Sequence, residues 1–134
     1  MKIPRKEGDV QRSVIELLKR LSILAFRMNS GKFALEYKGK QRFFRAGCPG
    51  MADVLAFPWV KWSVDVKAPM PLWIECKSSR GKQSREQELF QKVVESKGHT
   101  YLLVQSAAEV YDWLAVYVSG SKKHAGKEFV ATRD

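Results

Sequence analysis

The six residues Leu72-Trp73-Ile74-Glu75-Cys76-Lys77 constrain the possible fold most. Their apolar start predicts a β-strand, since short apolar runs between turn residues are typical of strands. Strand periodicity places Glu75 and Lys77 on the face of Trp73, opposite Ile74 and Cys76. Charged side chains on a central strand cost free energy unless they are paired or ligated. The alternative interpretation is a Glu–Lys ion pair on a half-exposed strand.

Apolar spacing and turn residues divide the rest of the chain into elements. Val10, Val14 and Leu18 recur at helical spacing, and the segments 84–87 and 106–109 match capping boxes. We expect helices from near Glu7 or Asp9 to Leu21, at 84–98 and at 106–117. Strands are expected at 23–28, 53–57, 72–77 and 100–104. We also expect a hairpin of 33–37 with 41–45 and a hairpin excursion at 59–71.

This order predicts an α/β fold with a mixed β-sheet flanked by helices. A chain of 134 residues fits one domain, so we assign 1–134 to a single domain. The strand at 100–104 is almost wholly apolar, and we expect it to be buried on both faces. The basic segment 119–134 is expected to fray or to lie on the surface.

The formal net charge of +10 favours a polyanionic partner, because basic residues attract phosphates and release their counterions. A merely soluble basic protein is the alternative. No apolar run has the length of a membrane span or follows the basic start as in a secretory signal. Two cysteines do not make a disulfide framework, and we expect a reducing cytoplasm, that of a bacterium or of a phage-infected host. Cys48, Cys76, His99 and His124 lack the paired spacing of a zinc site.

Three further residues each have two interpretations. Asp53 lies where a glycine-containing loop enters an apolar strand, either as a turn cap or as a metal ligand beside Glu75. Glu7 shares a helical stripe with Val14 and Leu18, so it either faces the sheet or simply favours the helix dipole. Gln87 either completes a capping box with Ser84 or points its amide towards the carboxylates.

Glu-x-Lys alone is a weak motif, and Asp65-Val66-Lys67 is a second copy without an apolar strand before it. The combination is more specific, and it extends over about residues 7–104. It consists of Glu7 with Gln11 on a first helix, Arg27-Met28-Asn29-Ser30-Gly31, Gly50-x-x-Asp53, Glu75-Cys76-Lys77, and Ser84-x-x-Gln87 with Gly98 ending the second helix. This set resembles the PD-(D/E)xK nuclease superfamily, particularly its VRR-NUC branch, in which compact basic proteins are often similar to Holliday junction resolvases.

The resemblance implies a restriction-endonuclease-like core and hydrolysis of phosphodiesters that depends on Mg²⁺, for which Mn²⁺ substitutes. Asp53, Glu75, the main-chain carbonyl of Cys76 and Glu7 are then expected to bind the metal. Lys77 assists the attacking water, and Gln87 shapes the site. Two features depart from the superfamily: Ala52 stands where its name expects proline, and the stretch between Asp53 and Glu75 is long.

Basic and polar residues near the expected site predict contacts with DNA phosphates. Because no base-reading motif is present, recognition of branched or junction DNA by shape is favoured, as in DNA recombination or repair. Symmetric cutting of a junction predicts a homodimer. Alternatives are a flap- or nick-directed nuclease, a general VRR-NUC nuclease, a nonenzymatic DNA-binding module, and a basic protein that binds no nucleic acid. The expected DNA contacts are Arg5, Lys6, Asn29, Ser30, Gly31, Lys38, Lys40, Arg42, Arg80, Lys82 and Arg85.

Overall fold

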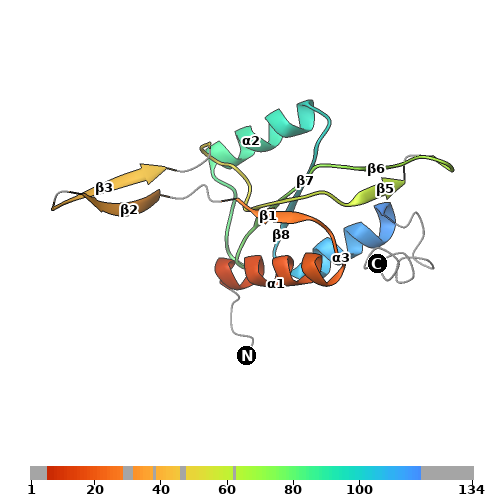
Figure 1. Cartoon of the computed structure of the whole chain (residues 1–134), viewed down its shortest axis with the longest axis horizontal. Coiled ribbons are helices and arrows are strands. Elements are labelled where there is room, and N and C mark those ends of the chain that lie inside the picture. Colours follow the sequence, from red (N-terminus) through yellow and green to blue (C-terminus); the bar gives the residue numbers. More distant parts are fainter. Residues whose placement is uncertain (1–5, 29–31, 38, 46–47, 62, 119–134) are drawn as a thin grey trace.

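A four-stranded mixed sheet forms the centre of the fold (Figure 1). The computed structural model describes residues 6–28, 32–37, 39–45, 48–61 and 63–118. The strand order is β1-β4-β7-β8, in which β4 runs antiparallel to β1 and β7, and β7 runs parallel to β8. The strands are β1 (Ala25–Arg27), β4 (Val54–Ala56), β7 (Leu72–Cys76) and β8 (Thr100–Val104).

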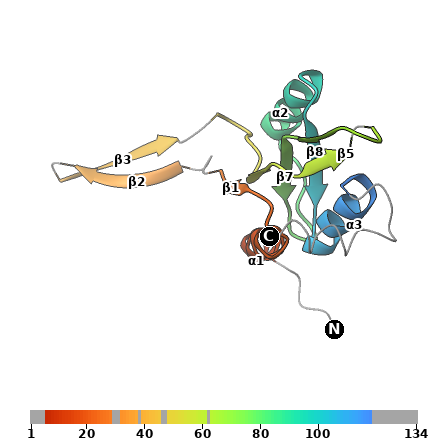
Figure 2. The ribbon, with the colours of Figure 1, turned by 45° about the vertical axis from the view of Figure 1, so that its right-hand side comes forward.

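Helices cover the two faces of this sheet, as Figure 2 shows. On one face, α1 (Glu7–Arg20) and α3 (Ala107–Tyr117) pack against the buried side chains of β4 and β7. On the other face, α2 (Arg85–Ser96) packs around Trp73. The expected α/β fold with a mixed sheet flanked by helices is therefore confirmed.

The capping signals locate two helix starts correctly. Ser84 accepts a hydrogen bond from the Gln87 backbone N–H, and the Gln87 side chain accepts one from the Ser84 N–H. Ahead of α3, the Glu109 carboxylate accepts from the Ser106 N–H at 3.0 Å. Each pair satisfies backbone donors that the first turn of a helix otherwise leaves free. The expected first helix is also confirmed, since Val10, Val14 and Leu18 are all buried.

Two hairpins leave the central sheet. The strands β2 (Lys32–Tyr37) and β3 (Lys40–Arg45) form one, and β5 (Trp59–Lys61) and β6 (Lys67–Pro69) form the other. Both were expected from the sequence. The β2–β3 hairpin projects away from the rest of the fold in both views (Figures 1 and 2).

The structure corrects two expectations for the central strands. The strand expected at 23–28 is limited to Ala25–Arg27. The strand β8 is not buried on both faces, because Leu103 is 46% exposed. This strand is at the sheet edge, and the side chains Phe90 and Val94 of α2 pack around Tyr101, which faces the same way as Leu103. The helix thus leaves Leu103 exposed to solvent. No helix within the described part of the chain is long and apolar enough to span a membrane.

Candidate metal centre

Three carboxylates converge at one end of the sheet. Glu7, Asp53 and Glu75 each offer one oxygen atom, and these atoms lie within 4.8 Å of one another. The register explains the meeting of two of them: Val54 pairs with Ile74 in the antiparallel ladder, so the residue before Val54 lies beside the residue after Ile74. Glu7 reaches the same place because it is the first residue of α1, which packs across β4 and β7.

Backbone hydrogen bonds hold Asp53 in this position. Its Oδ2 atom accepts a hydrogen bond from the Cys76 N–H at 2.8 Å, and its main-chain oxygen accepts one from the Met28 N–H at 2.7 Å. The Asp53 side chain is thereby tied to β7, and its backbone is tied to the chain that leaves β1. Asp53 is more than a turn cap, since its carboxylate is fixed next to a second carboxylate.

Glu75 is the most deeply buried member of the cluster, with 1% of its surface exposed. Its Oε2 atom accepts a hydrogen bond from Gln87 Nε2 at 3.2 Å and lies 3.6 Å from Lys77 Nζ. Lys77 is itself buried, with 7% exposed. The alternative of an ion pair on a half-exposed strand is therefore wrong: the pair is buried.

The second oxygen of Glu75, Oε1, is buried and has no hydrogen-bond donor among the described residues. A buried carboxylate oxygen without a donor is costly. Its neighbour Asp53 is also a carboxylate and can bond to it only when one of the two carries a proton. A proton shared with Asp53 or a bound cation would satisfy this oxygen.

The electrostatics of the cluster favour the same conclusion. Burial, reinforced by the adjacent charge of Asp53 and opposed by that of Lys77, raises the pKa of Glu75 to about 8. A bound divalent cation offsets the repulsion between the carboxylates, and hard oxygen ligands suit Mg²⁺ or Mn²⁺. The three acids and the unsatisfied Oε1 atom of Glu75 therefore fit a hard cation.

Gln87 has both of the roles that the sequence left open. Its Oε1 atom accepts from the Ser84 N–H at 2.9 Å and so caps α2, while its Nε2 group donates to Glu75 at 3.2 Å. One amide therefore fixes the start of the helix and the orientation of the buried acid.

Gly50 allows α2 to approach the loop that carries Asp53. Its φ is +77°, and a Cβ atom placed there would lie 2.2 Å from the main-chain oxygen of Glu86 and 2.7 Å from the Gln87 nitrogen. Only glycine fits this position without moving the helix, because any side chain would overlap backbone atoms. The start of α2 thus packs directly on the Gly50 loop.

The Cys76 thiol takes no part in the acidic cluster. It lies within the core formed by α1, α3 and the sheet, and it is fully buried. Burial, together with the charge of Asp53, raises the pKa of this thiol far above its usual range, so it stays protonated. A role for Cys76 in binding metal is limited to its main-chain carbonyl.

The residues expected to bind DNA divide into three groups. Four of them are exposed and flank the acidic cluster along the chain: Lys6 precedes α1, Arg80 and Lys82 follow β7, and Arg85 begins α2. Lys40 and Arg42 belong to β3 in the projecting hairpin. Arg5, Asn29, Ser30, Gly31 and Lys38 lie outside the described residues.

One neighbour of the cluster is absent from the set of site residues expected from the sequence. Arg27 is exposed at the end of β1 and pairs with Val54, the residue after Asp53. Its positive charge lowers the pKa of Cys76, although burial and the charges of the three acids raise that pKa by more. The sequence motif from Arg27 to Gly31 contains this residue. Its place beside the cluster, however, results from the pairing of β1 with β4, which are separated in the sequence by β2 and β3.

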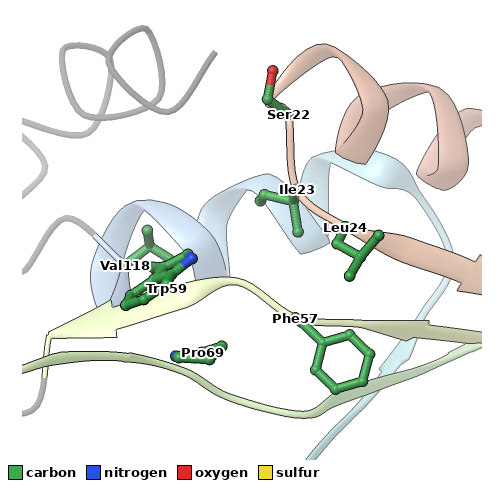
Figure 3. A pocket seen from close by; sticks show the side chains of 7 residues that line it. All are labelled: Ser22, Ile23, Leu24, Phe57, Trp59, Pro69 and Val118. Carbon is green, nitrogen blue, oxygen red and sulfur yellow. The ribbon is translucent and has the colours of Figure 1, made fainter. Parts of the chain in front are cut away.

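A separate apolar pocket of about 300 Å³ lies at the other end of β4 (Figure 3). Phe57, which follows β4, contributes to its lining, whereas Asp53 precedes that strand. None of the three acids lines this pocket. Its lining residues are Ser22, Ile23, Leu24, Phe57, Trp59, Pro69 and Val118.

The motif Asp65-Val66-Lys67 differs in its surroundings from Glu75-Cys76-Lys77. Asp65 and Lys67 are both exposed in the β5–β6 hairpin and outside the acidic cluster. They provide a matched internal comparison for the buried Glu75 and Lys77. No protein-family model matches the chain, and neither a curated protein nor a solved structure is significantly similar to it.

Proposed function

We propose that this protein is a metal-dependent DNA endonuclease of the PD-(D/E)xK type that hydrolyses backbone phosphodiesters, with four-way junctions as its main substrate. The observation that carries the proposal is the buried Glu75, whose Oε1 atom lacks a donor among the described residues, within 4.8 Å of oxygens from Glu7 and Asp53 and beside Lys77. Burial of an acid and a lysine side by side is costly, and a cation-binding catalytic site provides a reason for it.

Asp53, Glu75 and Glu7, with the main-chain carbonyl of Cys76, are the residues that would hold Mg²⁺. When bound, the ion lowers the pKa of a coordinated water and neutralises charge on the phosphoryl oxygens. Asp53 is oriented for this role by the N–H of Cys76, and Glu75 by the amide of Gln87. Such supporting hydrogen bonds fix the direction of the ligand oxygens.

Lys77 is the group that would act on the reacting atoms. Its Nζ lies 3.6 Å from Glu75 Oε2, at the edge of the acidic cluster. An ammonium group there can orient the attacking water or stabilise charge that develops on the phosphoryl oxygens. Gln87 acts as a positioning residue, because its described contacts are with Glu75 and the start of α2.

Exposed cations on the elements that carry the acids support DNA as the substrate. Lys6 precedes Glu7, Arg80 and Lys82 follow Lys77, and Arg85 begins the helix of Gln87. Contacts of this kind bind phosphates without reading sequence. The order α1, β1, β4, β7, α2, β8 around a mixed sheet supports a restriction-endonuclease-like core. A homodimer would present two sites to the two strands of a junction, and a monomeric mass across micromolar concentrations would exclude it.

The test is cleavage of a labelled four-way junction, the matching linear duplex and a flap, in Mg²⁺ or in EDTA. Asp53→Asn and Lys77→Ala change the candidate site. Asp65→Asn and Lys67→Ala make the same changes at the exposed Asp65-Val66-Lys67 copy and serve as matched controls.

We expect paired, symmetric nicks in the junction that require Mg²⁺, disappear in the two site variants and persist in the two controls. Equal cleavage of all three substrates would replace junction resolution by a general structure-directed nuclease. Tight, salt-dependent binding with no cut in any condition would favour the nonenzymatic DNA-binding module.

A further inference from the structure

The β2–β3 hairpin forms a sheet of its own. Within the described residues its strands pair only with each other, and it projects away from the four-stranded sheet in both views (Figures 1 and 2). A two-stranded hairpin alone is marginally stable in water. An arm of this kind gains stability when it binds a partner.

The excursion that carries the hairpin begins and ends beside the acidic cluster. The chain leaves β1 towards the hairpin at Met28 and returns to the sheet at Asp53, where the Met28 N–H donates to the Asp53 main-chain oxygen at 2.7 Å. The two ends of the excursion therefore meet at one of the three acids. The hairpin is thus inserted between two segments of the chain that contact each other at the candidate metal centre.

The register separates two unlike faces of the ribbon. The pairs Phe33 with Phe44, Leu35 with Arg42 and Tyr37 with Lys40 alternate with the pairs Lys32 with Arg45, Ala34 with Phe43 and Glu36 with Gln41. Since successive residues of a strand belong to opposite faces, the first three pairs share one face and the last three the other. Each face holds two cations. The first face adds three aromatic residues and no acid, whereas the second adds one aromatic residue and the single acid of the hairpin strands.

The charge of the hairpin favours a polyanion as its partner. Residues 32–45 contain five basic residues and one acid. Two copies of such an arm repel each other, which disfavours a second copy of this chain as the occupant. Aromatic residues alternating with cations suit a nucleic acid, because bases stack on aromatic rings while cations neutralise phosphates.

We propose that the face formed by Phe33, Leu35, Tyr37, Lys40, Arg42 and Phe44 binds DNA at a branch point and stacks on bases exposed there. This inference rests on the proposed function and specifies its substrate class: DNA whose stacking is interrupted next to the scissile phosphate. Uninterrupted duplex offers phosphates to the cations but no base face to the aromatic positions.

The test measures binding in EDTA, so that it is independent of cleavage. The DNA is a junction or a flap with 2-aminopurine at the branch, and an unbranched duplex is the reference. Tyr37→Leu and Phe44→Leu remove an aromatic ring but keep an apolar residue, so the hairpin retains its strand propensity. Phe43→Leu makes the same change on the opposite face and is the matched control. Far-UV circular dichroism of each variant checks that the hairpin persists.

We expect each of Tyr37→Leu and Phe44→Leu to weaken binding of the branched DNA about tenfold and to reduce the change in 2-aminopurine emission on binding. Phe43→Leu should bind as the unmodified chain does. Equal affinities and equal emission in all three variants overturn the inference, even if the chain cuts junctions as proposed. Face-specific loss of stacking in a chain that cuts nothing keeps the inference and removes the nuclease.

Discussion

Gln87 connects the start of a helix to a buried acid on a neighbouring strand. Its Nε2 group donates to Glu75 Oε2 at 3.2 Å, and its Oε1 atom accepts from the Ser84 N–H at 2.9 Å. The position of α2 and the orientation of Glu75 therefore depend on one side chain. A substitution that removes only one of these two bonds separates the roles.

Gln87→Glu is such a substitution. Glutamate serves equally well at the third position of a capping box, so the helix start is retained. The amide that donates to Glu75 becomes a carboxylate, which repels the ionised form of Glu75. We expect cleavage to fall about 10- to 100-fold, as for other groups that orient metal ligands. In EDTA at about pH 8.5, where Glu75 is ionised, we expect the free energy of unfolding to fall by about 1–3 kcal/mol. Single-turnover cleavage and urea denaturation measure the two effects.

Glu109→Ala is the matched control, because Glu109 completes the capping box of α3 and is not one of the three acids of the cluster. It should cost about 1 kcal/mol of stability and leave the cleavage rate unchanged. If Gln87→Glu cuts as fast as the unmodified chain, Gln87 is a helix cap and nothing more.

Gly50→Ala tests whether the approach of α2 to the Asp53 loop matters. The new Cβ would overlap the main-chain oxygen of Glu86, 2.2 Å away, so the helix start has to move and take Gln87 with it. Gly98→Ala is the matched control, since Gly98 also has a positive φ, +85°, but nothing lies within 4 Å of its Cβ position. The control should cost about 1–2 kcal/mol through backbone strain alone. We expect a larger loss of stability for Gly50→Ala in urea denaturation, together with a loss of cleavage that the control does not show.

Local signals in the sequence predict much of this fold. The apolar stripe of α1, the capping boxes of α2 and α3 and the apolar approach to Glu75 all depend on residues close together in the chain. The candidate acids were also predictable, because Asp53 precedes a strand, Glu75 lies within one and Glu7 begins a helix stripe. Periodicity indicates the face on which each of these residues lies.

What the sequence could not give depends on pairing between distant segments. Leu103 looks like a core residue by composition, yet it is exposed because β8 is an edge strand and Leu103 is outside the cluster that α2 forms with Tyr101. Arg27 comes next to Asp53 only through the pairing of β1 with β4. The dual role of Gln87 likewise requires the start of α2 to lie beside Glu75 of β7. None of these follows from local spacing.

The raised pKa of Glu75 predicts how stability depends on pH. Because the folded chain holds this proton to about pH 8 and the unfolded chain loses it near 4.5, the folded state binds more protons between these values. This group therefore stabilises the metal-free protein fully below about pH 4.5, and the contribution is lost as the pH rises towards 8. In EDTA, the melting temperature should fall from pH 6 to pH 8.5.

If Mg²⁺ binds at this site, it should reverse this trend, because metal binding requires the deprotonated carboxylate and the affinity then rises with pH. We expect Mg²⁺ at about 10 mM to increase the melting temperature more at pH 8.5 than at pH 6. Glu75→Gln should remove both effects. A Mg²⁺ shift that is the same at both pH values would show that Glu75 is not a metal ligand.

Lys77→Met separates catalysis from stability. Methionine has a length similar to that of lysine and no charge, so it fills the same buried space beside Glu75. Near pH 6 the neutral, protonated Glu75 does not need the ammonium group, because its pKa is raised to about 8 even with Lys77 present. We therefore expect the free energy of unfolding in EDTA to change by less than about 1 kcal/mol.

Cleavage by Lys77→Met should instead fall about 10²- to 10⁴-fold, the range typical of removing a group that acts on proton transfer. Lys67→Met, at the exposed Asp65-Val66-Lys67 copy, should cut at the unmodified rate. Single-turnover rates at saturating protein compare the two variants, and urea denaturation in EDTA verifies that both are folded. If Lys77→Met is folded and retains its rate, the ammonium group is a structural partner of Glu75, and the acids alone carry the reaction.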